Sequence, residues 1–195
     1  MIAFLKGKLV LKEPTFVIIE VNGIGYQVSI SLNTFSEIAD KETIQLATYL
    51  QVREDAHILY GFSNPAEKVM FQNLISVNGV GPNTAMVMLS YLPPDELHQA
   101  IVSENVGALQ AVKGIGGKTA QRIILELKDK LRKEPSGSTG IGGIKHNTMR
   151  QEALTALMTL GIGKGAAEKS IDTVLKKSGN TISLEELVKM ALKNA

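Results

Sequence analysis

Residues 77–85, Val-Asn-Gly-Val-Gly-Pro-Asn-Thr-Ala, recur 35 residues further along the chain as residues 112–120, Val-Lys-Gly-Ile-Gly-Gly-Lys-Thr-Ala. Each copy lies between two stretches whose apolar residues recur at helical spacing. The shared element is a glycine, an apolar residue and a second glycine, which suits a tight turn between two helices. The repeat therefore predicts two paired-helix hairpins in the middle of the chain.

The two turns resemble the helix-hairpin-helix motif and suit phosphate binding. Glycine adopts positive φ and allows close approach of another backbone. The helix that follows presents unpaired N–H groups and the positive end of its dipole, where a phosphate oxygen can bind without a large basic patch. Such contacts carry no base sequence information. The residues expected at this interface are Asn78, Gly79, Val80, Gly81, Asn83, Thr84, Gly114, Ile115, Gly116, Gly117, Lys118, Thr119 and Arg122.

A single hairpin of this kind is explained equally well as a purely structural connection, but two copies at matching positions favour DNA binding. In both copies the apolar residue between the glycines, Val80 or Ile115, is expected to anchor the turn in the core. The alanine at the end of each copy, Ala85 or Ala120, is expected to let the two helices pack closely.

The chain before the repeat reads as short strands. Residues 16–21 and 26–30 flank Asn22-Gly23, a strong two-residue turn signal. Further strands are expected over 44–52 and 57–60, with a short helix over 32–38. Residues 57–60 count as the fifth strand, and five short strands in about 60 residues predict a small barrel of the OB type, with a five-stranded sandwich as the alternative.

The sequence pattern changes from strand-like to helical at Asn64-Pro65, which suits a helix cap followed by the first helical residue. Helices are then expected after Pro93-Pro94 and over 120–132. Residues 135–148 are rich in glycine and serine and predict a linker. Three further helices are expected beyond it, the last capped by Ser183. The predicted class is a multidomain α+β protein with a barrel (1–63), a double-hairpin domain (64–134), the linker (135–148) and a three-helix module (149–195).

Composition bounds the function but does not decide it. The chain has no cysteine, which excludes disulfides and thiolate metal sites. Its net charge is +2, and residues 1–62, 63–134 and 135–195 carry −2, +1 and +3, so no segment has the excess of a DNA-coating surface. Residues 1–6 lack a basic leader followed by a long apolar run, and no apolar run is long enough to span a membrane. We expect a cytoplasmic protein.

No catalytic motif is evident. Gly116-Gly117-Lys118-Thr119 looks like the end of a P-loop, but that motif needs a glycine where Val112 stands. The preceding residues 105–111 read as helix and not as a buried strand, which argues against an intrinsic ATPase. The three histidines lie in different segments, and no carboxylate set is spaced for a metal. We expect a non-catalytic protein without metal or cofactor.

The order of these modules resembles the RuvA family, the Holliday-junction-binding subunits of bacterial branch-migration complexes. The resemblance is specific at residues 22–26, 52–56 and 59–62 and at both hairpins. It implies a homotetramer, with an octamer as a further state, that holds a four-way DNA junction open without reading its sequence. It also implies work in recombination and DNA repair beside a RuvB-type hexameric ATPase, which drives branch migration, and a RuvC-type resolvase.

The resemblance assigns two further sets of residues. Glu54 and Asp55 match the acidic pin at the centre of the junction, where like charge repels phosphates. Acids in a hairpin turn are otherwise simply solvated. The set expected to bind the motor is apolar and comprises Leu157, Leu160, Ile162 and Leu192. The alternative is that these side chains are the core of a small bundle, and for Leu157 that alternative is equally well supported.

The chain departs from the family pattern at two positions. Asn83 and Gly117 stand where members often carry basic residues, so two phosphate-pairing charges are missing and Lys118 and Arg122 become the expected pairing side chains. Two other functions compete with a junction scaffold. A repair glycosylase or nuclease would need a catalytic Lys or Asp beside the hairpin, or a metal cluster, and neither is found. An interaction adaptor would use the hairpins only structurally.

Overall fold

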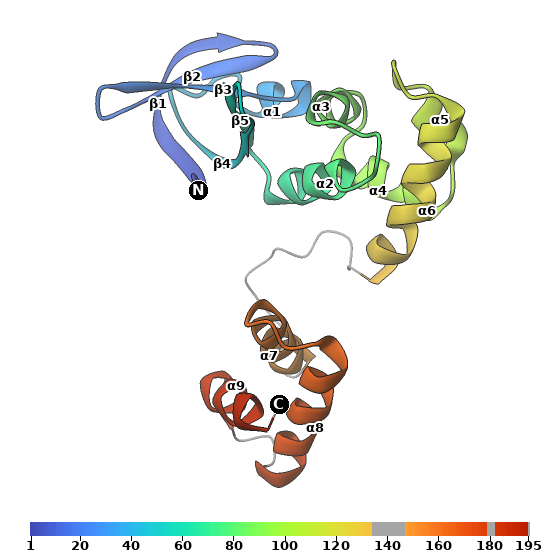
Figure 1. Cartoon of the computed structure of the whole chain (residues 1–195). Helices are drawn as coiled ribbons and strands as arrows, with labels where there is room; N and C mark the ends of the chain where they lie inside the picture. Colours follow the sequence, from blue (N-terminus) through green and yellow to red (C-terminus); the bar gives the residue numbers. More distant parts are fainter. Residues whose placement is uncertain (134–146, 179–181, 195) are drawn as a thin grey trace. The chain divides into compact units, whose positions relative to one another are not determined.

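The computed structural model describes residues 1–133, 147–178 and 182–194. The chain divides into two compact units, Met1–Gly140 and Ile141–Ala195 (Figure 1). The expected linker, residues 135–148, lies outside the described residues except for its last two, which already belong to a helix.

The first unit begins with a closed five-stranded barrel (Figure 1). Its strands are β1 (Phe4–Glu13), β2 (Phe16–Val21), β3 (Ile24–Ser29), β4 (Thr43–Val52) and β5 (His57–Phe62). Neighbours follow the order β1-β2-β3-β5-β4, and the pairs are antiparallel except for β3 with β5. Because the sheet closes on itself, the predicted OB-type barrel is confirmed and not the alternative five-stranded sandwich. The short helix α1 (Leu32–Glu37) follows β3 as predicted.

The barrel follows directly from its sequence pattern. Alternate residues of β2 point inward, and Val17 and Ile19 are fully buried with Val28 and Leu46 from the neighbouring strands. Asn22 and Gly23 both have positive φ, 50° and 84°, as the two central residues of a tight strand turn require.

Five helices follow the barrel in the described part of the first unit, residues 1–133. They are α2 (Pro65–Ile75), α3 (Pro82–Tyr91), α4 (Pro94–Val102), α5 (Val106–Gln110) and α6 (Gly117–Lys133). The side chain of Asn64 caps α2 by accepting from the Ala66 N–H at 2.8 Å, with Pro65 as the first helical residue, so the predicted start is confirmed. Helix α6 begins at Gly117, three residues before the predicted start.

Helix α2 is attached to the barrel by an apolar and a polar contact. The Phe71 ring of α2 packs against Tyr60 and Phe62 of β5, with ring centroids 5.1 and 5.0 Å apart. Glu67 of α2 is 2% exposed and accepts hydrogen bonds from the hydroxyls of Ser31 and Thr34, the latter at 2.6 Å. Helix α2 is thus fixed to the barrel by an apolar contact and a buried polar one.

The second unit is a bundle of α7 (Asn147–Thr159), α8 (Lys164–Ser178) and α9 (Leu184–Lys193). Its core contains Leu154, Leu157, Ile171 and Leu187. Ser183 forms a capping box with Glu186 at the start of α9, which confirms the predicted cap. Arg150 of α7 donates two hydrogen bonds to the Asp172 carboxylate of α8, at 2.9 and 3.2 Å.

Candidate nucleic-acid interface

The turns of the two hairpins have the same main-chain geometry. In the first, the N–H of Val80 donates to the carbonyl of Val77 at 3.0 Å, and Gly79 has φ +89°. In the second, Ile115 donates to Val112 at 3.1 Å, and Gly114 has φ +92°. A positive φ at the third residue of a four-residue turn favours glycine, as in a type II turn.

The helix after each turn starts in the same way. Ala85 donates to the Gly81 carbonyl at 3.0 Å, and Ala120 donates to the Gly116 carbonyl at 2.9 Å. Gly81 caps α3 without a side-chain hydrogen bond, so no side chain of the cap residue covers the first N–H groups of that helix. One difference concerns Pro82, which has no N–H, whereas its counterpart Gly117 has one.

Burial separates anchoring residues from exposed ones identically in both hairpins. Val80 and Ile115 are both 5% exposed, and Ala85 and Ala120 are fully buried, as their predicted packing roles require. Thr84 and Thr119 are half-buried. The exposed members of the predicted set, which lie at the turns and helix starts, are Asn78, Gly79, Gly81, Asn83, Gly114, Gly116, Lys118 and Arg122.

The first hairpin is also attached to the barrel through Asn83. The Tyr60 hydroxyl of β5 lies 3.5 Å from the Asn83 side-chain oxygen and 3.5 Å from that of Gln51 in β4. Burial raises the pKa of the Tyr60 hydroxyl, and the positive charge of Arg53 partly offsets this. The hydroxyl therefore stays protonated near neutral pH and can donate to Asn83.

Glu54 and Asp55 lie in the turn between β4 and β5, and both are exposed. The turn is closed by the N–H of Arg53, which donates to the Ala56 carbonyl at 2.8 Å. The acids are therefore presented on a short, closed connection of the barrel and contribute nothing to its core.

Comparison with known proteins decides the family. Residues 1–61 match the family described as RuvA N terminal domain, and residues 71–129 match SAM-like Helix-hairpin-helix tandem. A protein of Cytophaga hutchinsonii is 51% identical over 197 residues, with 99% of each chain covered. A protein of Christiangramia forsetii is 50% identical over 193 residues, also with 99% of each chain covered. Both are named Holliday junction branch migration complex subunit RuvA.

The chain belongs to the RuvA family. The predicted family resemblance is thereby confirmed, and with it the barrel and tandem-hairpin architecture. Across the described residues, no helix is long and apolar enough to cross a membrane. Within residues 1–133, 147–178 and 182–194, no three His, Asp or Glu side chains gather in a way that could hold a metal ion.

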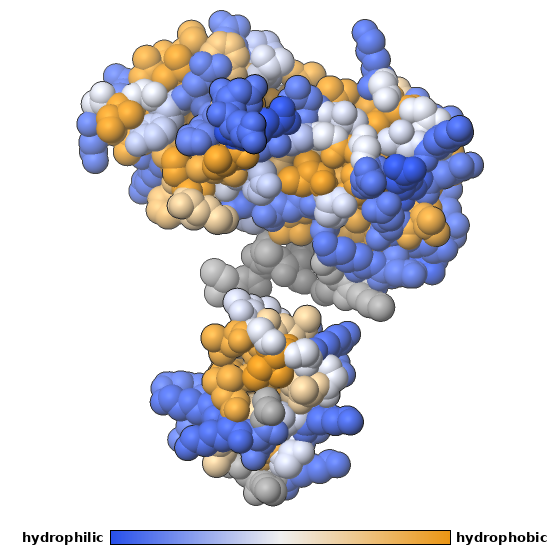
Figure 2. Space-filling view, viewed as in Figure 1, coloured by the Kyte–Doolittle hydropathy of each residue, from blue (hydrophilic) through white to orange (hydrophobic). Residues whose placement is uncertain are grey.

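The four residues that the RuvA resemblance assigns to motor binding divide by exposure. Leu157 is fully buried in the core of the second unit, so the structure places it with the core alternative. Ile162 packs against the same core, whereas Leu160 and Leu192 are 62% and 41% exposed. Figure 2 shows an apolar area on the face of this unit turned to the viewer.

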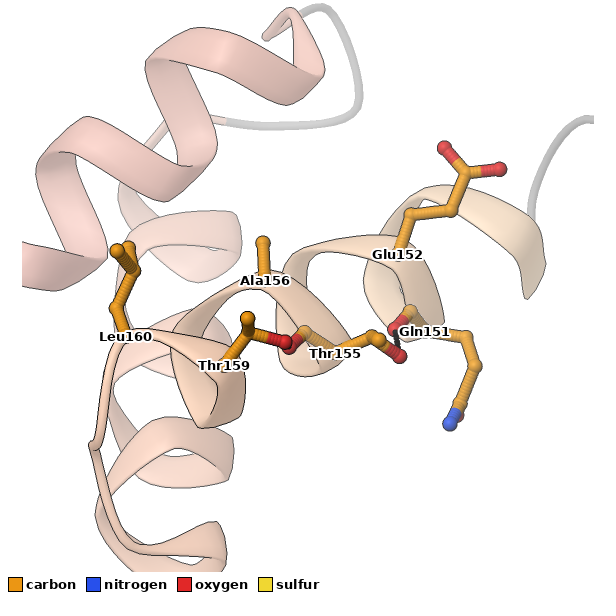
Figure 3. A pocket seen from close by; sticks show the side chains of 6 residues that line it. All are labelled: Gln151, Glu152, Thr155, Ala156, Thr159 and Leu160. Carbon is orange, nitrogen blue, oxygen red and sulfur yellow. Dashed lines mark hydrogen bonds between the residues drawn. The ribbon is translucent and has the colours of Figure 1, made fainter. Parts of the chain in front are cut away.

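Leu160 lines a shallow groove on α7 in this RuvA-family module. Figure 3 shows it beside Ala156, Thr159 and Thr155, with Gln151 and Glu152 further along the helix. The hydroxyls of Thr155 and Thr159 donate to the carbonyls four residues earlier, at 2.9 and 2.8 Å, which leaves their methyl groups as contact surface.

The predicted set omitted several residues of these surfaces. Lys113 occupies the position of Asn78 in the second turn and is exposed, and the internal repeat alone could have identified it. The groove-lining Thr155 and Thr159 gave no such signal, because threonine on a helix usually indicates an ordinary solvated face. The contact between Arg122 and the carbonyl of Asn78 was also not predicted, although both residues belong to the set, because they lie 44 residues apart.

Proposed function

We propose that this chain is a non-catalytic subunit that binds four-way DNA junctions as a homotetramer and passes them to an ATP-driven motor. The observation that carries the proposal is the pair of hairpins with matching turns at Gly79 and Gly114, each followed by a helix start. Two such main-chain sites per protomer suit the phosphate backbone and read no bases. The relatives' names, which place them in a Holliday junction branch migration complex, support the same function.

A four-armed substrate suits this arrangement because each hairpin binds weakly on its own. A tetramer engages four arms at once, and linking weak sites raises overall affinity without new contacts. The exposed acids Glu54 and Asp55 fit a role at the crossover, where their charge repels phosphates and keeps strands apart. A repair enzyme is not favoured, because the relatives are named as complex subunits and not as enzymes that act on bases or strands.

The groove on α7 is the proposed docking surface for a RuvB-type hexameric ATPase. Leu160 at one end of it and Leu192 of α9 are exposed apolar side chains on a small unit, and such side chains are typical of protein-binding surfaces. Leu157 is not part of this surface, because it is buried.

Binding of a four-way junction and of a linear duplex with the same arm sequences, measured by gel shift across a salt series, tests the proposal. We expect the junction to bind at least about 100-fold more tightly, since several weak sites act together. Both affinities should fall with salt through counterion release. Equal affinity for the two DNAs would remove the proposed function.

A chain ending at Glu134 tests the division of labour. It retains the barrel and both hairpins, so we expect it to fold, oligomerise and bind junctions within about twofold of the full chain. It should fail to support ATP-dependent branch migration with the motor, and the single variant Leu160→Asp in the full chain should share that failure. A truncated chain that still drives migration at normal concentrations would disprove the docking proposal.

A further inference from the structure

One side chain connects the two hairpins. Arg122, near the start of α6, donates from Nη1 to the carbonyl oxygen of Asn78 at 3.1 Å. A Cβ added at Gly79 would lie 3.6 Å from the same nitrogen. The guanidinium of the second hairpin therefore lies beside the turn of the first.

The repeat has no equivalent contact in the opposite direction. The counterpart of Arg122 in the first hairpin is Val87, and the counterpart of Asn78 is Lys113. Valine has no hydrogen-bond donor in its side chain, so it cannot hold the Lys113 carbonyl. The connection thus runs only from the second hairpin to the first.

The first hairpin also has fewer main-chain donors than the second and no positive charge of its own. Residues 77–85 contain no Lys or Arg, whereas residues 112–120 contain Lys113 and Lys118. Pro82 removes a main-chain N–H that Gly117 retains at the matching position. A phosphate at the first hairpin would therefore meet fewer N–H groups and no local positive charge.

We propose that Arg122 is a positioning residue of the first hairpin, which braces the Asn78–Gly79 peptide and places there the positive charge that position 83 lacks. This inference rests on the proposed DNA binding. The Asn78 carbonyl and the Gly79 N–H belong to one peptide group, so a hydrogen bond from a cation to the oxygen strengthens the N–H as a donor. A guanidinium has five N–H donors, so the bond to Asn78 leaves others for a phosphate oxygen.

The contact is tested first without DNA. In the full chain, Arg122→Gln should shift the amide proton resonance of Gly79 while that of Gly114 stays in place. Lys118→Gln, an equal charge loss at the exposed start of the same helix, is the matched control and should leave Gly79 unchanged. A Gly79 resonance that does not respond to Arg122→Gln, or that responds equally to both variants, would overturn the inference.

Charge rescue then tests the role in binding. Arg122→Gln should weaken junction binding about tenfold and reduce its salt dependence. Adding Asn83→Lys to this variant returns a charge to the first hairpin and should restore most of the affinity. Gly117→Lys adds the same charge to the second hairpin, where its side chain would displace only the end of Gln110, and should restore much less.

The possible results are distinguishable. Equal rescue by Asn83→Lys and Gly117→Lys would show that only the total charge matters. An Arg122→Gln variant with wild-type affinity would show that the contact does not contribute to DNA binding. Either result overturns the inference. If the wild-type chain itself does not prefer junctions, the proposed function fails, while the Gly79 resonance still reports on the contact.

Discussion

The two hairpins share their main chain and differ in their side chains. The N–H to carbonyl distances of the hydrogen bonds that close their turns are 3.0 and 3.1 Å, and the turn glycines have φ +89° and +92°. Yet the first carries Asn83 where the second carries Lys118. What stays the same is therefore the path of the main chain through the turn, and what varies is the charge around it and the one N–H that Pro82 removes. If the hairpins bind phosphate as we propose, their shared main-chain geometry defines the site and the side chains adjust its strength.

The hairpins also differ in what holds them. The first is fixed to the barrel, since Asn33 of α1 donates to the Leu89 carbonyl and the Leu32 N–H donates to Ser90 at 3.1 Å. The second closes the helical core through α6, whose Ile123 is fully buried. The two hairpins thus have the same turn, although the first is held by the barrel and the second by the helical core.

The largest effect should come from the turn glycines themselves. Gly79→Val and Gly114→Val place a β-branched residue at positive φ and cover the approach to the main chain. Each variant should lose junction affinity by about 100-fold or more, because in the proposed tetramer each arm is held by both hairpins of a protomer. Fluorescence anisotropy with a labelled junction measures this.

Gly23→Val is the matched control, because Gly23 has φ +84° and open space around it but lies in a barrel turn away from the hairpins. It should lower the melting temperature as much as the hairpin variants do and leave binding intact. If the hairpin variants unfold well below the temperature at which Gly23→Val does, the turns are structural and the phosphate role loses its support.

A charge exchange between the hairpins should have the next largest effect. Lys118→Asn should weaken junction binding by about tenfold, and Asn83→Lys should strengthen it by a similar factor, since each changes one charge beside phosphates. The double exchange should then bind close to wild type. A double variant as weak as Lys118→Asn alone would show that the hairpins are not equivalent sites.

Neutralising the acidic turn should have a small effect of opposite sign. Glu54→Gln with Asp55→Asn should leave junction binding unchanged or strengthen it by about twofold, because repulsion of nearby phosphates is relieved. The rate of motor-driven branch migration should change. Loss of binding in this double variant would mean that the acids hold the fold or the oligomer, although both side chains are exposed.

Glu67, which helps to hold α2 on the barrel, should affect the stability of the fold and not the binding of DNA. Burial raises the pKa of Glu67 above its ordinary value of 4.5, although hydrogen bonds from Ser31 and Thr34 oppose this. The folded state then holds the proton more tightly than the unfolded state. Stability is therefore greatest below the ordinary value and falls as the pH rises through the raised one, by about 1.4 kcal/mol for a difference of one pKa unit.

Glu67→Gln removes this titration and keeps both hydroxyl partners, which can donate or accept. Melting temperatures across that pH window should decline for the wild type and stay flatter for the variant, with junction affinity unchanged at neutral pH. Glu104→Gln is a useful contrast, because Lys128 lowers the pKa of Glu104 and its contribution is lost on acidification instead. A variant as pH-dependent as the wild type would exclude Glu67 as the source.

The sequence predicted local features well where a single residue type determines them. Asn64, Pro65 and Ser183 marked helix starts, Asn22-Gly23 marked a strand turn, and the repeat located both hairpins. These features depend on backbone preferences of a few neighbouring residues, which the sequence states directly.

Features that depend on the tertiary fold could not be predicted. The carboxylate of Glu67 reads as a solvated acid in the first turn of a helix, and only the docking of α2 on the barrel buries it. Leu154, Leu157 and Leu160 read as one apolar stripe, but α7 ends at Thr159 and Leu160 lies beyond it, exposed. The Arg122 contact joins residues of the two hairpins, and no local pattern encodes it.

Hydroxyl-radical footprinting of a four-way junction tests most directly whether the two hairpins are equivalent backbone-binding sites. We expect two protected backbone segments on each of the four arms with the wild-type chain, independent of arm sequence. Gly79→Val should remove one segment from every arm, and Gly114→Val should remove the other. Protection confined to one arm, or one that changes with base sequence, would contradict a tetrameric scaffold that grips DNA through its main chain.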